Sequence, residues 1–524
     1  MISPNRQIAR SAALVMVFFV LSRVLGLARQ MVVGAMFGAG AELDAFWAAN
    51  RVPDAIFLIV AGGALGSAFI PAFAERLARE NRAGAWRLAS AVVNLALLLL
   101  TVLAALTALC APALVSAFIA PGFDPAQQAL TTDLLRLMLV SPVIFGVSGI
   151  VMGVLNAHQH FLLPALAPSI YNLSIIGGAV LLGPWMGVRG MALGAVAGAA
   201  LHLLVQTPGL FRYGARYVPA LGLNDPGVRE VGRLMAPRVL GTAIVELNFF
   251  VNNSLASAMG EGAVSAINYA WLLMLLPQGV FAQAVGTAAF PTFAAQAARG
   301  ERDEMRRTLA ATLRTVFVLC LPATVGLIAL GRPLVTLLFQ RGAFDADAAG
   351  AVAWALAFYA LGLVGHAGLE IVARAFYALH DTFTPVWVGG LTMALNVGLS
   401  LTLPSLCLQM GCPPHAGLAL ANSVATLLEL VALVLLIRRR VGGLQGRRML
   451  VSLAKSGVAS LAMGAGLWVW QAALGEVNVF VVGGGGVILG VLVYVLLAFL
   501  LRLDELRAIA RLARPLRWKR DARA

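Results

Sequence analysis

The stretch "FIPAFAERLARENRAGAWRLASA" (residues 69–91) returns in altered form, at an offset of 220, as "AFPTFAAQAARGERDEMRRTLAA" (residues 289–311). The copies share residues in register: Pro71 aligns with Pro291, Phe73 with Phe293, Arg79 with Arg299 and Arg87 with Arg307. Two further pairs follow in the same order, "PALVSAFIAPGFD" with "PLVTLLFQRGAFD" and "NAHQHFLLP" with "YALHDTFTP". Three ordered matches at nearly constant spacing indicate an internal duplication.

The composition places this duplicated chain in a membrane. Of its 524 residues, 60% are hydrophobic and 12% are charged, whereas about 25% charged residues is usual in soluble domains. Apolar windows of about 20 residues, long enough to cross the hydrocarbon core, recur along the whole chain. We therefore predict an all-α polytopic membrane protein with about fourteen transmembrane helices. The predicted spans are 11–37, 44–74, 88–118, 130–156, 161–183, 188–211, 234–257, 264–296, 309–330, 350–379, 383–404, 415–437, 450–473 and 479–501.

The duplication predicts the architecture. The offset of 220 residues contains six spans, and this even number gives both copies the same orientation about an axis along the membrane normal. Residues 1–220 then form one six-helix lobe, residues 221–441 a second, residues 442–503 two additional helices, and residues 504–524 a basic cytoplasmic tail. Two like lobes around a central cavity suit alternating access, so transport is the predicted class of function.

The net charge of +15 is unevenly distributed between the two sides of the predicted membrane. Loops on one side carry most of the arginines, whereas the opposite loops carry only Arg189, Arg332 and Arg341. By the positive-inside rule, the arginine-rich side and both termini are cytoplasmic. The charge therefore reflects topology and anionic membrane lipids, and no nucleic-acid partner is expected.

Few ionisable residues lie inside the first spans, and most of them are arginines. The segment "LSRVLGLAR" (residues 21–29) carries Arg23 and Arg29, and the next span begins with Asp44 and Arg51. An arginine near the bilayer centre costs about 2.5–3.5 kcal/mol on insertion scales, so such residues usually face a cavity or pair with an acid. One alternative is a purely structural pair between Asp44 and Arg29 or Arg51. Asp44 alone cannot neutralise three arginines, and the excess predicts a cationic cavity for an anionic substrate such as a phosphate.

The second half of the chain has fewer charges within its spans. Glu246 in "VELNFFVNNS" is a deep acid, and a carboxyl group in this setting is a candidate for ion or proton coupling; a neutral acid bonded to a neighbouring helix is the alternative. Cys407 and Cys412 share one loop, where they either pair or remain thiols. Neither a nucleotide-binding loop nor a cluster with metal-ligand spacing is present in the sequence, so we expect no enzyme, no cofactor and no metal site.

A family resemblance adds to this interpretation. The opening "LSRVLGLARQMVVGAMFGAGAELDAFWAANRVPD" resembles that of the MurJ (MviN) family, and "GALGSAFIPAF", "APGFD", "LNAHQHFLLPALAPSIYN" and "PTFAAQAA" match in order. The resemblance implies a lipid II flippase of the MOP exporter superfamily. Such proteins act in peptidoglycan synthesis and move undecaprenyl-diphosphate-linked disaccharide-pentapeptide from the inner to the outer leaflet of the bacterial cytoplasmic membrane.

The resemblance also implies roles for individual residues. Ser22, Arg23, Arg29 and Asp44 match cavity residues of the family, with the arginines expected to receive the diphosphate and Arg51 to add to their charge. Asn252 stands where some members carry an acid used with sodium, so coupling to Na⁺ or H⁺ is a further expectation. Two alternatives stay open: an exporter of another lipid-linked glycan or a cation-coupled antiporter of the same superfamily, and a membrane scaffold without transport.

Overall fold

The computed structural model describes residues 4–60, 64–475 and 478–506, and within these ranges the regular structure is entirely helical. Twelve of the described helical segments are long and apolar enough to cross a membrane, and each corresponds to one of the predicted spans. The prediction of an all-α polytopic membrane protein is thereby confirmed. The count of fourteen spans stays a prediction, because residues 61–63 and several side chains in the predicted spans 44–74 and 234–257 lie outside the described part.

The helices follow one another with short connections. In chain order they are α1 (Pro4–Phe37), α2 (Ala41–Val60), α3 (Ala64–Ala78), α4 (Arg82–Leu114), η1 (Val115–Ile119), α5 (Pro125–Met138), α6 (Val140–Ala157), α7 (Leu162–Gly177), η2 (Gly178–Leu182), α8 (Gly183–Met186), α9 (Val188–Leu204), α10 (Thr207–Arg212), α11 (Pro226–Ser257), α12 (Ala263–Pro277), η3 (Gln278–Gln283), α13 (Ala284–Ala298), α14 (Arg302–Phe339), α15 (Ala346–Ala378), α16 (Phe383–Gln409), α17 (Pro414–Val441), α18 (Gly446–Leu474), η4 (Phe480–Gly485) and α19 (Gly486–Leu500). The four η segments are π-helical turns: η1 extends α4, η2 joins α7 to α8, η3 joins α12 to α13, and η4 leads into α19.

Two compact units divide the chain. The first unit comprises Met1–Ser265 with Phe339–Ala348, and the second comprises Ala266–Leu338 with Ala349–Ala524. Helix α11 therefore groups with the first unit, although the repeat-based boundary at residue 220 would separate it from the preceding helices. The predicted lobes are defined by the sequence repeat, whereas the two units are defined by how the chain packs. The lobes therefore stay a prediction.

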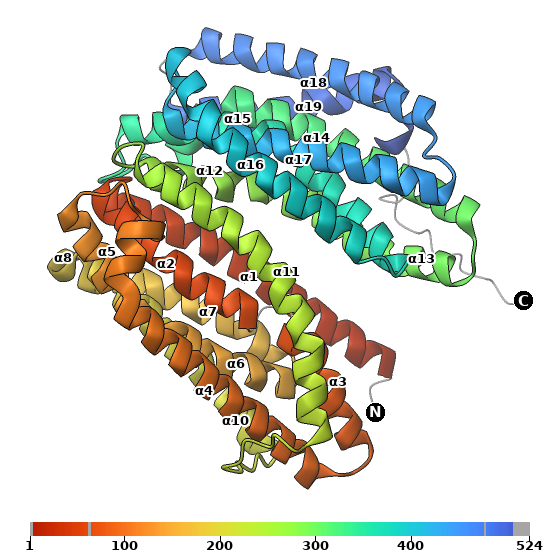
Figure 1. Ribbon diagram of the computed structural model, residues 1–524. Coiled ribbons are helices and arrows are strands. Elements are labelled where there is room, and N and C mark those ends of the chain that lie inside the picture. The colour runs from red at the N-terminus through yellow and green to blue at the C-terminus, as the bar shows by residue number, and fades with distance from the viewer. Residues whose placement is uncertain (1–3, 61–63, 476–477, 507–524) are drawn as a thin grey trace, which may run out of the picture. The chain divides into compact units, whose positions relative to one another are not determined.

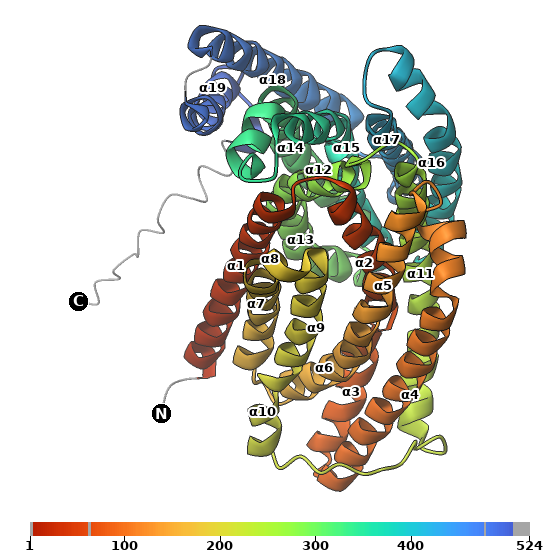
Figure 2. The same cartoon turned by 90° about the vertical axis from the view of Figure 1, so that its left-hand side faces the viewer.

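In the first unit, long helices pack side by side around α6 and α2. Helix α1 packs on α7, α7 on α9, and α2 on both α5 and α11 (Figures 1 and 2). Close approach of α7 and η2 to α9 depends on glycine. A Cβ atom on Gly178 would lie 2.6 Å from Gly194 Cα and 2.7 Å from the Gly190 carbonyl oxygen, so no larger residue fits without moving a helix. Small residues at helix contacts are the usual means of tight packing in membranes.

One end of the first unit is closed by an ion pair. The guanidinium group of Arg76 on α3 contacts both carboxylate oxygens of Asp225, the residue before α11, and also donates to the Gly84 carbonyl at 3.0 Å. Hydrogen bonding from Arg76 holds the pKa of the Asp225 carboxyl below its usual value, and the backbone N–H of Gly227 adds to this effect. The pair therefore joins the start of α11 to the end of α3, and Arg76 also contacts the first turn of α4.

In the second unit, α16 and α17 form a helical hairpin, and α18 and α19 form another. Tyr494 on α19 donates to the Val318 carbonyl on α14 and shares a hydrogen bond of 2.8 Å with Ser456 on α18. The end of the described chain is held by a buried ion pair, in which Arg314 Nε donates to Glu505 Oε1 at 3.0 Å. Residues 507–524 lie outside the described residues, so most of the predicted basic tail is not described.

The four cysteines are free thiols. Cys407 is buried near the end of α16, and Cys412 lies in the following turn, where its backbone N–H donates to the Cys407 carbonyl at 2.9 Å. The sequence left open whether Cys407 and Cys412 form a disulfide or remain thiols, and in the structure they are thiols.

Candidate functional site

Four charged side chains of the first unit come together from three helices. Arg29 lies on α1, Arg51 and Asp54 lie on α2, and Glu246 lies on α11. Arg29 and Arg51 both interact electrostatically with the Asp54 carboxyl, and Arg51 also acts on Glu246. We refer to these four residues as the arginine–carboxyl cluster.

Helical spacing explains why Arg51 and Asp54 share a face of α2. Residues three apart on a helix are neighbours, so the acid one turn beyond the arginine points the same way. Asn50 Nδ2 donates to Asp54 Oδ2 at 2.6 Å, which holds the carboxyl group in place from one turn earlier. Sequence analysis missed Asp54. The signal was available, because Asp54 follows Pro53 within the predicted span 44–74 and stands at helical spacing from Arg51.

Aromatic side chains lie near both arginines. The Arg51 guanidinium carbon lies 4.8 Å from the centre of the Phe249 ring, one helical turn after Glu246 on α11. A guanidinium group over an aromatic face is stabilised by the ring quadrupole, more so where water is excluded. On the other side, Tyr171 of α7 lies within electrostatic range of Arg29 and Asp54. Glu246 is 6% exposed, and its Oε2 accepts no hydrogen bond from the described residues.

The remaining predicted residues of α1 lie one to two turns before Arg29. Asn172 Nδ2 on α7 donates to the Ser22 carbonyl at 3.4 Å and to the Pro168 carbonyl at 3.1 Å, so Ser22 lies at the contact between α1 and α7. Arg23 is exposed on α1. The structure thus places Ser22, Arg23 and Arg29 along one helix, and their role in binding stays a prediction.

Asp44 is held by backbone groups between α11 and the first turn of α12, and its place at the substrate site stays a prediction. Its side chain is fully buried, and its two oxygens accept from the backbone N–H groups of Gly262 and Ser265, each at 2.7 Å. These donors lie at the connection between α11 and α12. The acid beside Arg29 and Arg51 is Asp54, whereas Asp44 holds this connection to the start of α2.

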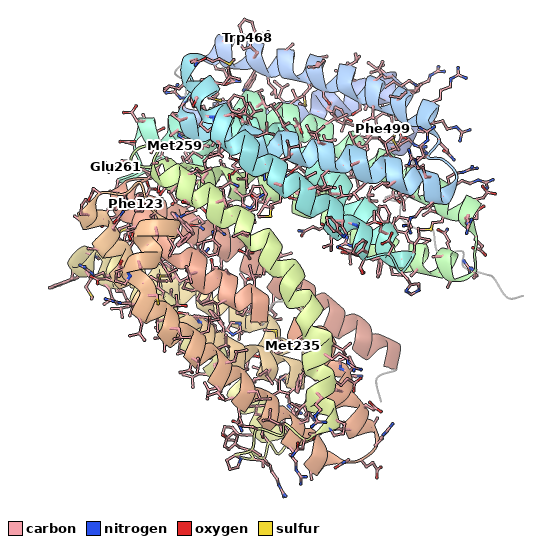
Figure 3. All side chains as sticks on the ribbon, in the orientation of Figure 1. Phe123, Met235, Met259, Glu261, Trp468 and Phe499 are labelled. Carbon is pink, nitrogen blue, oxygen red and sulfur yellow. The ribbon has the colours of Figure 1, made fainter. Side chains whose placement is uncertain are left out.

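Neighbouring contacts reinforce that connection. Glu261 Oε1 accepts from the Ala41 backbone N–H at 3.0 Å, and Gln127 Nε2 donates to the Ala41 carbonyl at 2.8 Å. Figure 3 shows Met259 and Glu261 close to Phe123 at this end of the first unit. Gly122, next to Phe123, approaches so closely that a Cβ atom on it would lie 2.3 Å from Ala258 Cα. The connection is therefore a tightly built structural element.

The second candidate for ion coupling, Asn252, is buried on α11. Its amide donates to the side-chain oxygen of Asn248 at 2.7 Å and to the Asn248 carbonyl at 3.1 Å. Asn253, directly after it, donates to the Ile119 carbonyl at 3.0 Å. Ion coupling by Glu246 and Asn252 stays a prediction. Within the described part of the chain, no group of three or more His, Cys, Asp and Glu side chains is placed to hold a metal ion.

The cluster combines the chemistry needed to bind an anion reversibly. Two guanidinium groups offer planar pairs of N–H donors that match phosphate oxygens. Two carboxyl groups, those of Asp54 and Glu246, lie within electrostatic range of the same arginines. The cationic cavity predicted from the sequence stays a prediction, and Asp54 and Glu246 are acids that the prediction did not place beside Arg29 and Arg51.

Comparison with protein families gives a clear assignment. A family model described as lipid II flippase MurJ matches residues 33–483. A lipid II flippase MurJ of Burkholderia cenocepacia is 34% identical over 434 residues, covering 81% of this chain and 82% of the relative. A probable lipid II flippase MurJ of Haemophilus influenzae is 28% identical over 464 residues, covering 86% and 90%.

Solved structures with the same fold include a lipid II flippase MurJ in an inward closed conformation. It superposes with a TM-score of 0.79 at 24% sequence identity, over 94% of this chain and all of that chain. An inward-facing multidrug resistance transporter of the MATE family in the MOP superfamily superposes with a TM-score of 0.67 at 18% identity, over 82% and 99%. At these identities the structural likeness concerns the fold alone.

Proposed function

This chain belongs to the lipid II flippase MurJ family, and we propose on that premise that it carries undecaprenyl-diphosphate-linked peptidoglycan precursor from the inner to the outer leaflet. The observation that supports this substrate class best is the pair of arginines, Arg29 and Arg51, brought together from α1 and α2 inside the first unit. A lipid diphosphate is anionic at its headgroup and apolar along its tail, so it suits a cationic site within a membrane protein.

In this proposal, Arg29 and Arg51 bind the diphosphate oxygens through their paired N–H groups. Arg23 and Ser22 extend the polar face of α1 toward the preceding turns, where they meet the headgroup as it enters or leaves. Asp44 contributes by holding the start of α2, and with it Arg51, in position. Neither a nucleotide nor another cofactor is required for these steps, since binding and release are the only chemistry.

Movement between the leaflets would follow alternating access of two lobes, residues 1–220 and 221–441, around a central cavity. Residues 442–503 would add two helices to the second lobe. Glu246 and Asn252 are the candidates for coupling to Na⁺ or H⁺. The uneven distribution of arginines favours a multi-pass protein of the bacterial cytoplasmic membrane with both termini on the cytoplasmic side.

The proposal is tested by replacing the native flippase in bacterial cells depleted of it. Wild-type protein is expected to restore growth and cell shape, whereas Arg29→Ala and Arg51→Ala are expected not to, at equal membrane abundance. Arg79→Ala is the matched control, because Arg79 is an exposed arginine of the same unit that pairs only with Glu75 among the described residues. Equal rescue by Arg29→Ala, Arg51→Ala and the wild type would contradict the assigned site, and failure of the wild type itself would contradict the function.

A further inference from the structure

We propose that Asp54, assisted by Glu246, is a built-in counter-anion that competes with the substrate diphosphate for Arg29 and Arg51 and thereby sets how readily the substrate leaves. The inference rests on the proposed function and adds to it a residue that determines affinity. It starts from a juxtaposition of four charged side chains on α1, α2 and α11.

The first step is positional. Asp54 follows Arg51 by three residues on α2, and Asn50 fixes its carboxyl group through a hydrogen bond of 2.6 Å. Arg29 on α1 lies within electrostatic range of the same carboxyl group. A carboxyl group held by its own helix beside two arginines from two helices is a permanent member of the site, present whether or not substrate is bound.

The second step concerns Glu246. This side chain is 6% exposed, lies within electrostatic range of Arg51, and leaves its Oε2 without a hydrogen bond from the described residues. Phe249, on the same face of α11, contacts the Arg51 guanidinium and restricts where it can move. Arg51 therefore lies within electrostatic range of an acid on its own helix and of an acid on α11.

The third step is energetic. Guanidinium groups buried without counter-charge are strongly unfavourable in a membrane protein, and the two carboxyl groups provide this compensation while the site is empty. An arriving diphosphate takes over the paired N–H donors of the arginines and meets the negative charge of Asp54 and Glu246 at short range. This repulsion weakens binding, and a carrier must bind weakly enough to release its substrate on the other side.

The experiment measures binding of undecaprenyl diphosphate to the purified full-length protein in nanodiscs of phosphatidylcholine, by titration of tryptophan fluorescence and by native mass spectrometry. Asp54→Asn and Glu246→Gln remove one negative charge each with little change in shape. Each is expected to tighten binding by about tenfold, or about 1.4 kcal/mol, because the variant lacks a negative charge that would repel the diphosphate bound at the neighbouring arginines. Growth rescue by both variants is expected to fall, since tighter binding slows release.

The matched control is Asp133→Asn, which neutralises an acid of the same unit that pairs with Arg189 at 2.9 Å and is half exposed. Its affinity for undecaprenyl diphosphate should equal that of the wild type. Local damage to the site would weaken binding of undecaprenyl diphosphate. Tighter binding by Asp54→Asn or Glu246→Gln therefore distinguishes competition by the carboxyl group from a purely structural role. Thermal unfolding of each variant shows whether the fold is retained, and Glu246→Gln serves as the second variant if Asp54→Asn unfolds.

The outcomes distinguish this inference from the function on which it rests. If the wild type binds undecaprenyl diphosphate and Arg29→Ala does not, but folded Asp54→Asn and Glu246→Gln bind no more tightly than the wild type, the counter-anion role is wrong and the site stands. If the wild type fails to bind, or Arg29→Ala binds equally well, the site itself is wrong. Tighter binding with reduced growth rescue supports both.

Discussion

Replacing Asp44 with alanine is expected to destabilise the protein without removing its affinity for a lipid diphosphate. The Asp44 carboxylate is fully buried and accepts from two backbone N–H groups, those of Gly262 and Ser265, each at 2.7 Å. Family resemblance alone would assign Asp44 to the substrate site. The geometry assigns it to the connection between α11 and α12, and the two roles predict different results.

The magnitude follows from the contacts. A hydrogen bond to a charged acceptor contributes about 1.5–3 kcal/mol, and a buried N–H group left without an acceptor loses a similar amount. Two such bonds are lost in Asp44→Ala, so the expected destabilisation of the first unit is about 3–6 kcal/mol. Asp44→Asn keeps one acceptor oxygen and should lose about half as much.

Thermal unfolding of the detergent-solubilised full-length protein, followed by circular dichroism, measures the effect as a fall in Tm of about 5 °C or more. Glu42→Gln is the matched control, because this neighbouring acid of α2 is exposed. Binding of undecaprenyl diphosphate is then measured well below the Tm of the variant, where we expect near wild-type affinity. A wild-type Tm together with lost binding would refute the structural role and place Asp44 in contact with the substrate.

Three further predictions concern other parts of the chain. Asp225→Asn should lower Tm at pH 7. Because the folded-state pKa of Asp225 lies below the usual 3.8, the stability advantage of the wild type should be constant above about pH 5 and shrink as the pH falls below 4; an advantage that grows as the pH falls below 4 would contradict this. Glu505→Gln leaves the partly buried Arg314 without its charged partner and should destabilise the second unit by about 1.5–3 kcal/mol, measured by chemical unfolding, whereas an unchanged transition would show that the pair contributes nothing. Gly178→Ala should lower Tm because the added Cβ meets the backbone of α9, while Gly177→Ala, with no atom within 4 Å of its Cβ, should not; equal Tm values would contradict the close packing.

The membrane-spanning character and the helix positions were predictable from the sequence, because both depend on local properties. A run of about 20 apolar residues must satisfy its backbone hydrogen bonds internally in lipid, and the helix is the structure that does so within one segment. The twelve spans identified in the described part follow the predicted ranges for this reason. The repeated segments at 69–91 and 289–311 likewise predicted two related halves without any coordinates.

The composition of the charged cluster was decided by tertiary structure. Arg29, Arg51 and Glu246 were all noted in the sequence, but Glu246 was counted with the second half of the chain, where the 220-residue repeat places it. Only the packing of α11 against α2 brings Glu246 and Phe249 to Arg51. Contact between residues almost 200 positions apart depends on how helices pack, and hydropathy carries no information about that.

Asp44 and Asp54 illustrate the same limit on a single helix. Both are acids of α2, and the sequence offered Asp44 as the ion-pair partner of Arg29 or Arg51. They lie ten residues apart, which is about 15 Å along a helix, so they serve different neighbours: Asp44 meets the connection after α11, and Asp54 meets Arg29 and Arg51. Residue types and spacing predicted that charges would lie in the membrane, whereas the pairing of those charges followed from which helix faces meet.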